Sequence, residues 1–221
     1  MRNTSFLEAV QQGNMDQVRQ MLAQEPGLAQ TQTENGLSAL LLAAYYGHPQ
    51  VASLLASRRS DLTMFEACVV GDLQRVQDLL VGDPNLVNAF SADGFQPLGL
   101  SAFFNQPHVS RVLLEHGAEV NSPSHNAQKV PPLNSAAASG SLEIARMLLE
   151  HGADPNLRQE GGFVPLHNAA QNGQVELIEL LLKYGAEINV RAASGQTPLG
   201  FALEAGRAPA VELLRQRGGV E

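Results

Sequence analysis

The side chains that could support chemistry in this chain are six histidines, one cysteine and 22 carboxylates. Histidine, cysteine and carboxylate groups hold metal ions when they recur at short, fixed spacings along a helix or a turn. The histidines of this sequence do not recur in such a ligand pattern. We therefore expect no metal site and interpret the histidines as structural or solvated groups.

The positions of the histidines support that interpretation. His116 and His151 precede glycines at equivalent places, where an imidazole can donate to the last carbonyl groups of a helix. His167 lies in a turn, where we expect it to bond the neighbouring backbone. The remaining histidines mark the starts of two helices and a loop: His48, His108 and His125.

Cys68 is the one candidate for thiol chemistry. A lone cysteine cannot form an internal disulfide bond, which fits a reducing compartment. A reactive thiol would need a basic partner nearby, and the sequence suggests none. Equivalent positions elsewhere in the chain hold alanine, which favours a small buried filler. They are Ala44, Ala102, Ala137 and Ala170.

No catalytic motif accompanies these residues. The chain has no Gly-x-Ser-x-Gly elbow, no phosphate-binding glycine loop and no dinucleotide fingerprint. Its carboxylates are scattered over solvent-facing helix positions, although a pair formed between distant segments stays open at this point. We therefore predict a protein that is not an enzyme and that uses no cofactor.

The elements that must position any functional side chain are short helices arranged in pairs. Residues 164–189 show the pattern, because Pro165 opens an apolar helix that stops at Gly173 and a second helix stops at Gly185. Proline suits a first helical position, and glycine supplies the left-handed turn that closes a helix. Helices of this length are not stable alone, so each pair must pack against another.

Copies of this pair recur along the whole chain. An anchor residue, usually followed by leucine, has small residues four and five positions later and glycine eight positions later, with Asn105 as the one replacement for glycine. The intervals between anchors are 33 to 35 residues, apart from one of 24. Such a period indicates a stacked array. The anchors are Ser5, Ala39, Thr63, Pro97, Pro132, Pro165 and Pro198.

These repeats resemble the ankyrin repeat family. Thr197-Pro198-Leu199 and Val164-Pro165-Leu166-His167 lie where the family has its Thr-Pro-Leu-His turn, and residues 115–121 and 150–156 match the exit of its second helix. The resemblance covers essentially the whole chain and is most specific from Phe95 onward. It implies an all-α repeat solenoid of stacked helix pairs with β-hairpin fingers, which holds other proteins.

We expect a single domain over residues 1–221, with about seven units including both caps. The units are 3–34 (amino-terminal cap), 35–60, 61–92, 93–127, 128–160, 161–193 and 194–219 (carboxy-terminal cap). Two polar caps suggest a stand-alone protein built only of repeats. Residues 5–62 align without a gap on residues 63–120, which indicates an internal duplication. Only Arg58–Leu62 connects the second and third units, so we predict a missing finger there and a longer one within Asn121–Pro132.

Composition restricts the environment and the partners. Hydrophobic residues make up 44% of the chain, and the formal net charge is −8, which disfavours nucleic acid as a partner. No apolar stretch has the length of an export signal or a membrane span, so we expect a cytoplasmic protein that binds no membrane. Lysine occurs only at Lys129 and Lys183. This preference for arginine suggests a bacterial source with a GC-rich genome.

What remains for function is the concave surface, which we expect to include inner-helix positions three, six and seven residues after each anchor. Apolar loop residues two positions before the anchors and basic loop residues add to it. The alternative is that the aromatic residues fill gaps between helices or support the fingers. The predicted partner-binding residues are Leu42, Tyr45, Tyr46, Val69, Val70, Phe95, Leu100, Phe103, Phe104, Lys129, Arg158, Phe163 and Arg191.

The sequence thus predicts a non-catalytic scaffold whose groove grips a segment of another protein. Tyr45, Tyr46, Phe103 and Phe104 would anchor the partner, and charges on the rim would orient it. The alternative is self-association through the same apolar patch, with a homodimer in place of the expected monomer. A small-ligand or nucleic-acid binder is disfavoured, because the chain is acidic and no enclosed pocket is indicated.

Overall fold

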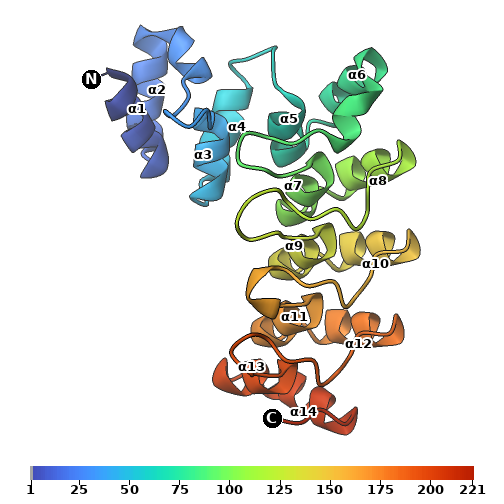
Figure 1. The fold of residues 1–221 in the computed structure, drawn as a ribbon. Coiled ribbons are helices and arrows are strands. Elements are labelled where there is room, and N and C mark those ends of the chain that lie inside the picture. Colours follow the sequence, from blue (N-terminus) through green and yellow to red (C-terminus); the bar gives the residue numbers. More distant parts are fainter. Residues whose placement is uncertain (1) are drawn as a thin grey trace. The chain divides into compact units, whose positions relative to one another are not determined.

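A computed structural model describes residues 2–221, which form fourteen α-helices and three short 3₁₀ helices (Figure 1). The α-helices follow one another in short pairs that are separated by loops. The one β-bridge in this range is antiparallel and joins Gln32 to Ser38. The predicted all-α repeat solenoid is therefore confirmed, while the loops between the pairs are turns rather than β-ladders.

The helix pairs belong to two compact units. Unit 1 comprises the described residues up to Leu86 together with Ser91–Asp93, and unit 2 comprises Val87–Phe90 and Gly94–Glu221. In unit 1, the inner helices α1, α3 and α5 pack side by side. Its pairs are α1 (Arg2–Gln11) with α2 (Met15–Gln24), α3 (Ala39–Tyr45) with α4 (Pro49–Ala56), and α5 (Met64–Val70) with α6 (Leu73–Gly82). The 3₁₀ helices η1 (Pro26–Gln30) and η2 (Pro84–Asn88) follow α2 and α6.

Unit 2 contains the remaining pairs, stacked in file (Figure 1). Its inner helices α7, α9, α11 and α13 form one row, and its outer helices α8, α10, α12 and α14 form a second. The pairs are α7 (Pro97–Phe103) with α8 (Pro107–Glu115), α9 (Pro132–Ser139) with α10 (Leu142–Glu150), α11 (Pro165–Asn172) with α12 (Val175–Lys183), and α13 (Pro198–Glu204) with α14 (Ala208–Gln216). The 3₁₀ helix η3 (Glu160–Gly162) precedes α11.

Local signals determine where the inner helices of unit 2 begin and end. Each begins at a proline, whose fixed φ angle suits the first turn. Gly140 and Gly173 follow α9 and α11 with φ angles of 76° and 75°. Asn105 follows α7 with a φ angle of 54°, so it takes the left-handed conformation that glycine has elsewhere. Asparagine is among the few other residues that tolerate this conformation.

The core of unit 2 is built from equivalent residues of each pair. Leu98, Leu133, Leu166 and Leu199 follow the anchor prolines and are at most 3% exposed. Buried alanines near the middle of each inner helix let neighbouring helices approach closely. Full burial of a leucine side chain contributes about 1.5–3 kcal/mol, so most of the stability of these short helices comes from packing between pairs.

An asparagine ahead of each helix pair of unit 2 bonds the glycine that follows the pair. Asn121 donates from Nδ2 to the carbonyl of Gly152 at 3.0 Å, and its Oδ1 accepts the amide of Asp154 at 2.9 Å. These bonds satisfy backbone groups at a helix exit and join each loop to the next. Both bonds recur at Asn88, Asn156 and Asn189.

Two connections differ in length from the others, as predicted. Residues 57–63 pass directly from α4 to α5 without a hairpin loop. In unit 2, the connection over residues 116–131 is two residues longer than those over 151–164 and 184–197. The first difference leaves a pocket in unit 1, and the second places a lysine at the tip of a loop in unit 2.

Candidate interaction surface

The loops ahead of the helix pairs in unit 2 are bonded to one another through their backbones. The carbonyl of Gly94 accepts the amide of His125 at 2.7 Å, and that of Gln128 accepts the amide of Glu160 at 2.8 Å. The carbonyl of Gly161 accepts the amide of Ala193, also at 2.8 Å. The loops therefore form a continuous row whose side chains keep a fixed spacing.

One position in each loop contributes to a column of exposed and half-buried side chains. It lies seven residues ahead of the inner helix and holds Phe90, His125, Arg158 and Arg191, which we call the loop column. The rings of Phe90 and His125 stack with centroids 3.5 Å apart and planes at 12°. Arg158 donates from Nη1 to the carbonyl of Arg191 at 2.9 Å. The column thus changes from aromatic to cationic along unit 2.

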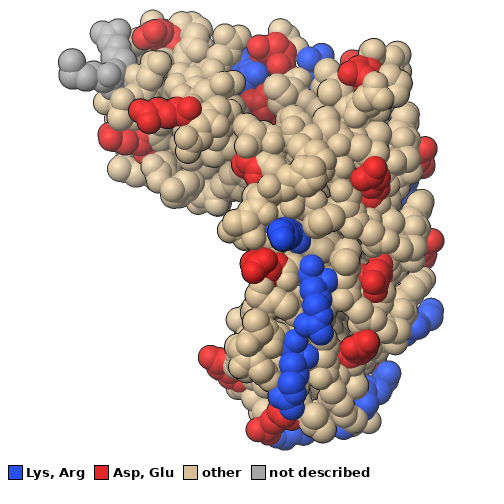
Figure 2. All heavy atoms as spheres, viewed as in Figure 1, with Lys and Arg blue, Asp and Glu red and all other residues tan. Residues whose placement is uncertain are grey.

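Sequence reasoning predicted Arg158 and Arg191 as binding residues but missed Phe90 and His125. It assigned His125 to a loop and did not single out Phe90 as a binding residue. Their common offset from the anchors was the signal that could have shown all four together. The side chains of both arginines are exposed. Figure 2 shows basic side chains in a line on this part of unit 2.

Lys129 has a backbone conformation that is unusual for its type. It lies three residues ahead of its inner helix, with a φ angle of 48°. Gly94, Gly162 and Gly195 occupy the same place in the other loops of unit 2, with φ angles of 83°, 73° and 86°. A lysine there costs about 1–2 kcal/mol, and strain of this kind tends to persist where the side chain has a function.

Phe103, at the end of α7, is one of the large apolar side chains that unit 2 exposes, together with Tyr184 and Val220. It is 45% exposed, and its ring meets the half-buried ring of Phe104 edge to face, with centroids 5.2 Å apart. Leu100, on the same helix, is only 1% exposed. Phe163 is half-buried against the rings of His167 and Phe201, and Phe95 is also half-buried.

Unit 1 carries the remaining predicted residues. Tyr46 is 52% exposed, whereas Leu42 and Val69 are buried and Val70 is half-buried. Tyr45 donates its hydroxyl to Asp93. Burial raises the pKa of Tyr45, and its hydrogen bond to the Asp93 carboxylate raises it further. The placement of the unit 1 aromatics beside Phe103 and Phe104 stays a prediction.

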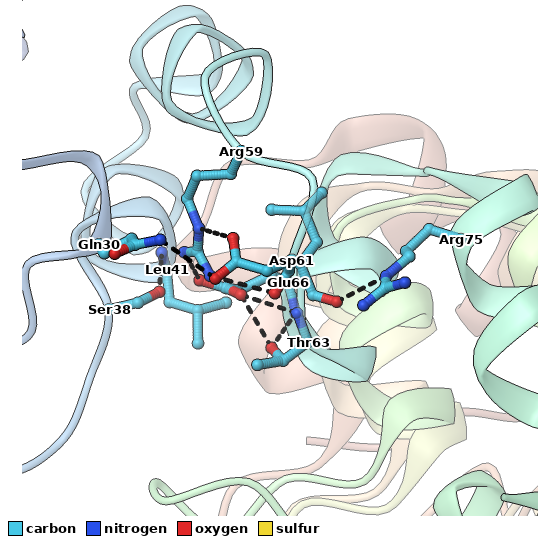
Figure 3. A network of polar contacts seen from close by, with 9 residues as sticks. Gln30, Ser38, Leu41, Arg59, Asp61, Thr63, Glu66 and Arg75 are labelled. Carbon is cyan, nitrogen blue, oxygen red and sulfur yellow. Dashed lines mark hydrogen bonds and ion pairs between the residues drawn. The ribbon is translucent and has the colours of Figure 1, made fainter. Parts of the chain in front are cut away.

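A buried ion pair that sequence reasoning missed fills the connection between α4 and α5 (Figure 3). The side chains of Arg59 and Glu66 are 7% and 2% exposed, and Nη1 of Arg59 donates to Glu66. Thr63 donates to the same carboxylate from its amide at 2.9 Å and from its hydroxyl at 3.0 Å, which caps α5. Nε of Arg59 donates to Asp61 at 3.0 Å, and this bond lowers the pKa of the Asp61 carboxyl.

A pocket of about 210 Å³ lies in unit 1 beside this ion pair. Arg59 and Glu66 line it together with the apolar side chains of Leu37, Leu41 and Phe65. The tips of two loops complete its wall. One tip contains Gly36 and the other contains Ala92 and Asp93. A Cβ atom placed on Gly36 would lie only 3.8 Å from that of Ala92, so the two tips meet at the pocket.

The remaining candidates for chemistry have structural surroundings. The Nδ1 atoms of His116 and His151 lie 2.8 and 2.7 Å from the carbonyls of Val112 and Met147, at helix ends as expected. His167 is buried between the amide of Val164 and the carbonyl of Val190. Cys68 is buried, and burial raises the pKa of its thiol. No three histidine, cysteine or acidic side chains within residues 2–221 lie close enough together to hold a metal ion.

Comparison with protein families finds matches in both units. Residues 133–182 match a family described as "Ankyrin repeats (many copies)", and residues 158–221 match one described as "Ankyrin repeats (3 copies)". Residues 35–66 match "Ankyrin repeat". Together the matches cover more than half of the 221 residues. Among the helices of residues 2–221, none combines the length and the apolar character needed to cross a bilayer.

Proposed function

The chain is an ankyrin repeat protein, and on this basis we propose that it binds a partner protein and catalyses no reaction. Ankyrin repeats are generally modules of protein–protein interaction and are typically not catalytic. A repeat array has no single active-site cleft, so its function depends on the side chains that it exposes in register. The question is therefore which exposed residues a partner would contact.

In this proposal the partner binds the loop row of unit 2 through an acidic segment. Lys129, Arg158 and Arg191 bring three of the 14 basic residues of an acidic chain to one row of loops. Such a local positive potential attracts and orients a negatively charged segment. The observation that carries the proposal is Lys129 itself, because a cation is retained in a backbone conformation that three equivalent loops assign to glycine.

The arginines of the loop column suit a carboxylate partner. In the part of the chain that the structure describes, Arg158 uses only Nη1 for its bonds to backbone carbonyls. A guanidinium has five N–H donors in a planar fork, so Nε and Nη2 of Arg158 can meet both oxygens of a carboxylate. The stacked rings of Phe90 and His125 continue the same column and offer a flat surface to apolar side chains.

Apolar anchors would supply most of the affinity. Phe103 in unit 2 and Tyr46 in unit 1 are large, exposed aromatic side chains, and a few such residues often dominate binding energy. Leu42, Val69 and Leu100 are buried and would keep these anchors in place without touching the partner.

Selection of peptides from a random displayed library tests the proposal. We expect the peptides that the chain binds to combine acidic residues with an apolar residue. We also expect added salt to lower the affinity of the chain for these peptides. The double variant Arg158→Glu, Arg191→Glu should bind the selected peptides at least about tenfold more weakly, a loss of about 1.4 kcal/mol. The control is Arg146→Glu, Lys183→Glu, which reverses two exposed charges on the outer helices α10 and α12.

Two results would contradict this function. One is selection of neutral or basic peptides only, and the other is equal loss of binding in both double variants. The alternative function is self-association through the exposed apolar residues. Light scattering tests it by measuring the molar mass of the protein in solution. We expect a monomer whose mass does not change with concentration. A dimer that Phe103→Ser dissociates would instead assign the exposed phenylalanine to contact with a second copy.

A further inference from the structure

We propose that the pocket of unit 1 binds the guanidinium group of an arginine side chain from a partner protein. Its lining includes Ser91–Asp93 from the loop ahead of α7 but none of the residues proposed to bind an acidic partner in unit 2, so its probes test it independently. The pocket lies where the chain passes from α4 to α5 without a hairpin loop. It therefore exists because one repeat lacks an element that the neighbouring repeats have.

The charges around the pocket favour a cation. Among the described residues that line the pocket, Arg59 is the one basic residue, and it already has two acidic partners, Glu66 at Nη1 and Asp61 at Nε. Asp93 adds a third carboxylate, positioned by hydroxyl donors from Tyr45 and Ser91. Of these three carboxylates, those of Glu66 and Asp93 line the pocket together with the one guanidinium of Arg59, and a second cation would balance the excess negative charge of this lining.

The size of the pocket limits what can enter. A volume of about 210 Å³ holds roughly seven water molecules at liquid density, and it is smaller than the 300–1,000 Å³ of most small-molecule sites. A single long side chain fits this space better than a cofactor. The apolar walls from Leu37, Leu41 and Phe65 would cover the aliphatic part of such a side chain.

Two features favour arginine over lysine. The wall contains several oxygen acceptors besides Asp93, including the side chains of Gln32 and Ser38, and a guanidinium can use up to five N–H donors at once. Phe65 presents an aromatic ring to the same pocket, and a planar guanidinium stacks on such rings. The ammonium group of lysine is more strongly hydrated and has only three donors.

Amide chemical shifts of the full ¹⁵N-labelled chain test the proposal with defined probes. Nα-acetyl-arginine amide should cause saturable shifts at Leu37, Phe65 and Ser91–Asp93. Nα-acetyl-citrulline amide, which has nearly the same shape without the charge, should bind at least about tenfold more weakly, the loss expected for one charge-assisted contact. Equal binding of the two probes, or arginine-induced shifts confined to other residues, would overturn the proposal.

A second pair of probes distinguishes a protein side chain from a free guanidinium compound. Agmatine carries the same group without a peptide backbone, whereas the peptide acetyl-Gly-Ser-Arg-Ser-Gly-amide carries it within a chain. The proposal requires that the peptide bind at least as well as agmatine. If agmatine binds and the peptide does not, the pocket is a small-molecule site and the assignment to a partner protein is wrong.

Variants test the placement of the probe. Asp93→Asn should weaken arginine binding about tenfold, whereas Asp16→Asn removes a charge elsewhere in unit 1 and should leave it unchanged. Since Asp93 also accepts bonds from Tyr45 and Ser91, a second variant blocks the pocket without altering that network. Ala92→Phe should abolish binding, and Ala193→Phe, at the same place in a loop of unit 2, should not. If either variant and its control behave alike, the assignment fails.

Discussion

Lys129 occupies in its loop the position that Gly162 occupies in the next loop, and both residues have a positive φ angle, 48° and 73° respectively. The two loops are bonded together, because the amide of Glu160 donates to the carbonyl of Gln128. Both positions therefore have a left-handed backbone conformation, which Gly162 adopts without steric cost and Lys129 does not. The lysine side chain is what distinguishes the two loops.

Replacing Lys129 with glycine should make the protein more stable and weaken binding. Relief of the left-handed strain is worth about 1–2 kcal/mol, and the greater freedom of glycine in the unfolded chain offsets about 0.4–1 kcal/mol of it. We expect the free energy of unfolding in urea to rise by roughly 0.5–1 kcal/mol, while acidic peptides bind more weakly. Lys129→Ala is the control, since it loses the charge and keeps the strain. A less stable glycine variant would contradict this account.

Breaking the buried pair of Arg59 and Glu66 should be costly. Glu66→Ala leaves a buried guanidinium without its main partner, which typically costs about 3–5 kcal/mol of unfolding free energy. Glu8→Ala is the matched control, because Glu8 holds the equivalent position in the first repeat and is exposed. The double variant Arg59→Met, Glu66→Leu should recover most of the loss, because it leaves no unpaired charge. A double-mutant cycle measures the coupling, and strictly additive losses would refute it.

Removing one asparagine of the loop-to-loop bonds should destabilise unit 2. Asn156→Ala deletes a donor to the carbonyl of Gly185 and an acceptor for the amide of Glu187. Two lost bonds correspond to about 1–3 kcal/mol. Hydrogen exchange of the amide of Glu187 should accelerate, because it loses its acceptor. Asn35→Ala, at an exposed loop tip of unit 1, is expected to change neither measurement.

Stability should fall below neutral pH because of His167. Burial lowers the pKa of this histidine below 6.5, and its Nδ1 accepts the amide of Val164, so the folded protein holds it neutral. The unfolded chain takes up a proton near pH 6.5, whereas the folded chain does so only at lower pH. Between these two values the unfolded state binds more protons, so unfolding becomes easier as the pH drops.

Thermal melting between pH 8 and pH 5 checks this expectation. The decline in Tm below pH 6.5 should be steeper in the natural chain than in His167→Asn, which has no proton to take up at this position. The variant His108→Asn, which changes an exposed histidine, should show the same steep decline in Tm as the natural chain. Equal slopes for the natural chain and His167→Asn would show that this residue does not control the effect.

Much of the fold could be predicted because its signals are local. Proline at the start of an inner helix and a left-handed residue after its end depend on neighbouring residues only. Asn105 shows the strength of this pattern, since it replaces glycine at this position and still adopts the left-handed conformation, with a φ angle of 54°. The missing loop could be predicted for a similar reason, because the interval between two anchors limits how much chain is available.

The site was less predictable because exposure and pairing depend on three-dimensional neighbours. Spacing placed Leu100 and Phe103 on the same helix face, but only the packing shows that the first is buried and the second exposed. Arg59 lies in a connection that has no counterpart in the other repeats, so periodicity could not pair it with Glu66. Phe90 and His125 had the required regularity, yet their stacking joins loops 35 residues apart in the chain.

The backbone bonds between the loops of unit 2 also bear on how such a protein can change during evolution. Because Gly94, Gln128 and Gly161 accept from the next loop through main-chain atoms, the spacing of the row does not depend on which side chains it carries. Point substitutions can therefore accumulate at the loop tips and redirect recognition toward new ligands, while the architecture below is inherited intact. Two additional residues are tolerated as well, because the longer connection over residues 116–131 is still bonded to the loops on both sides.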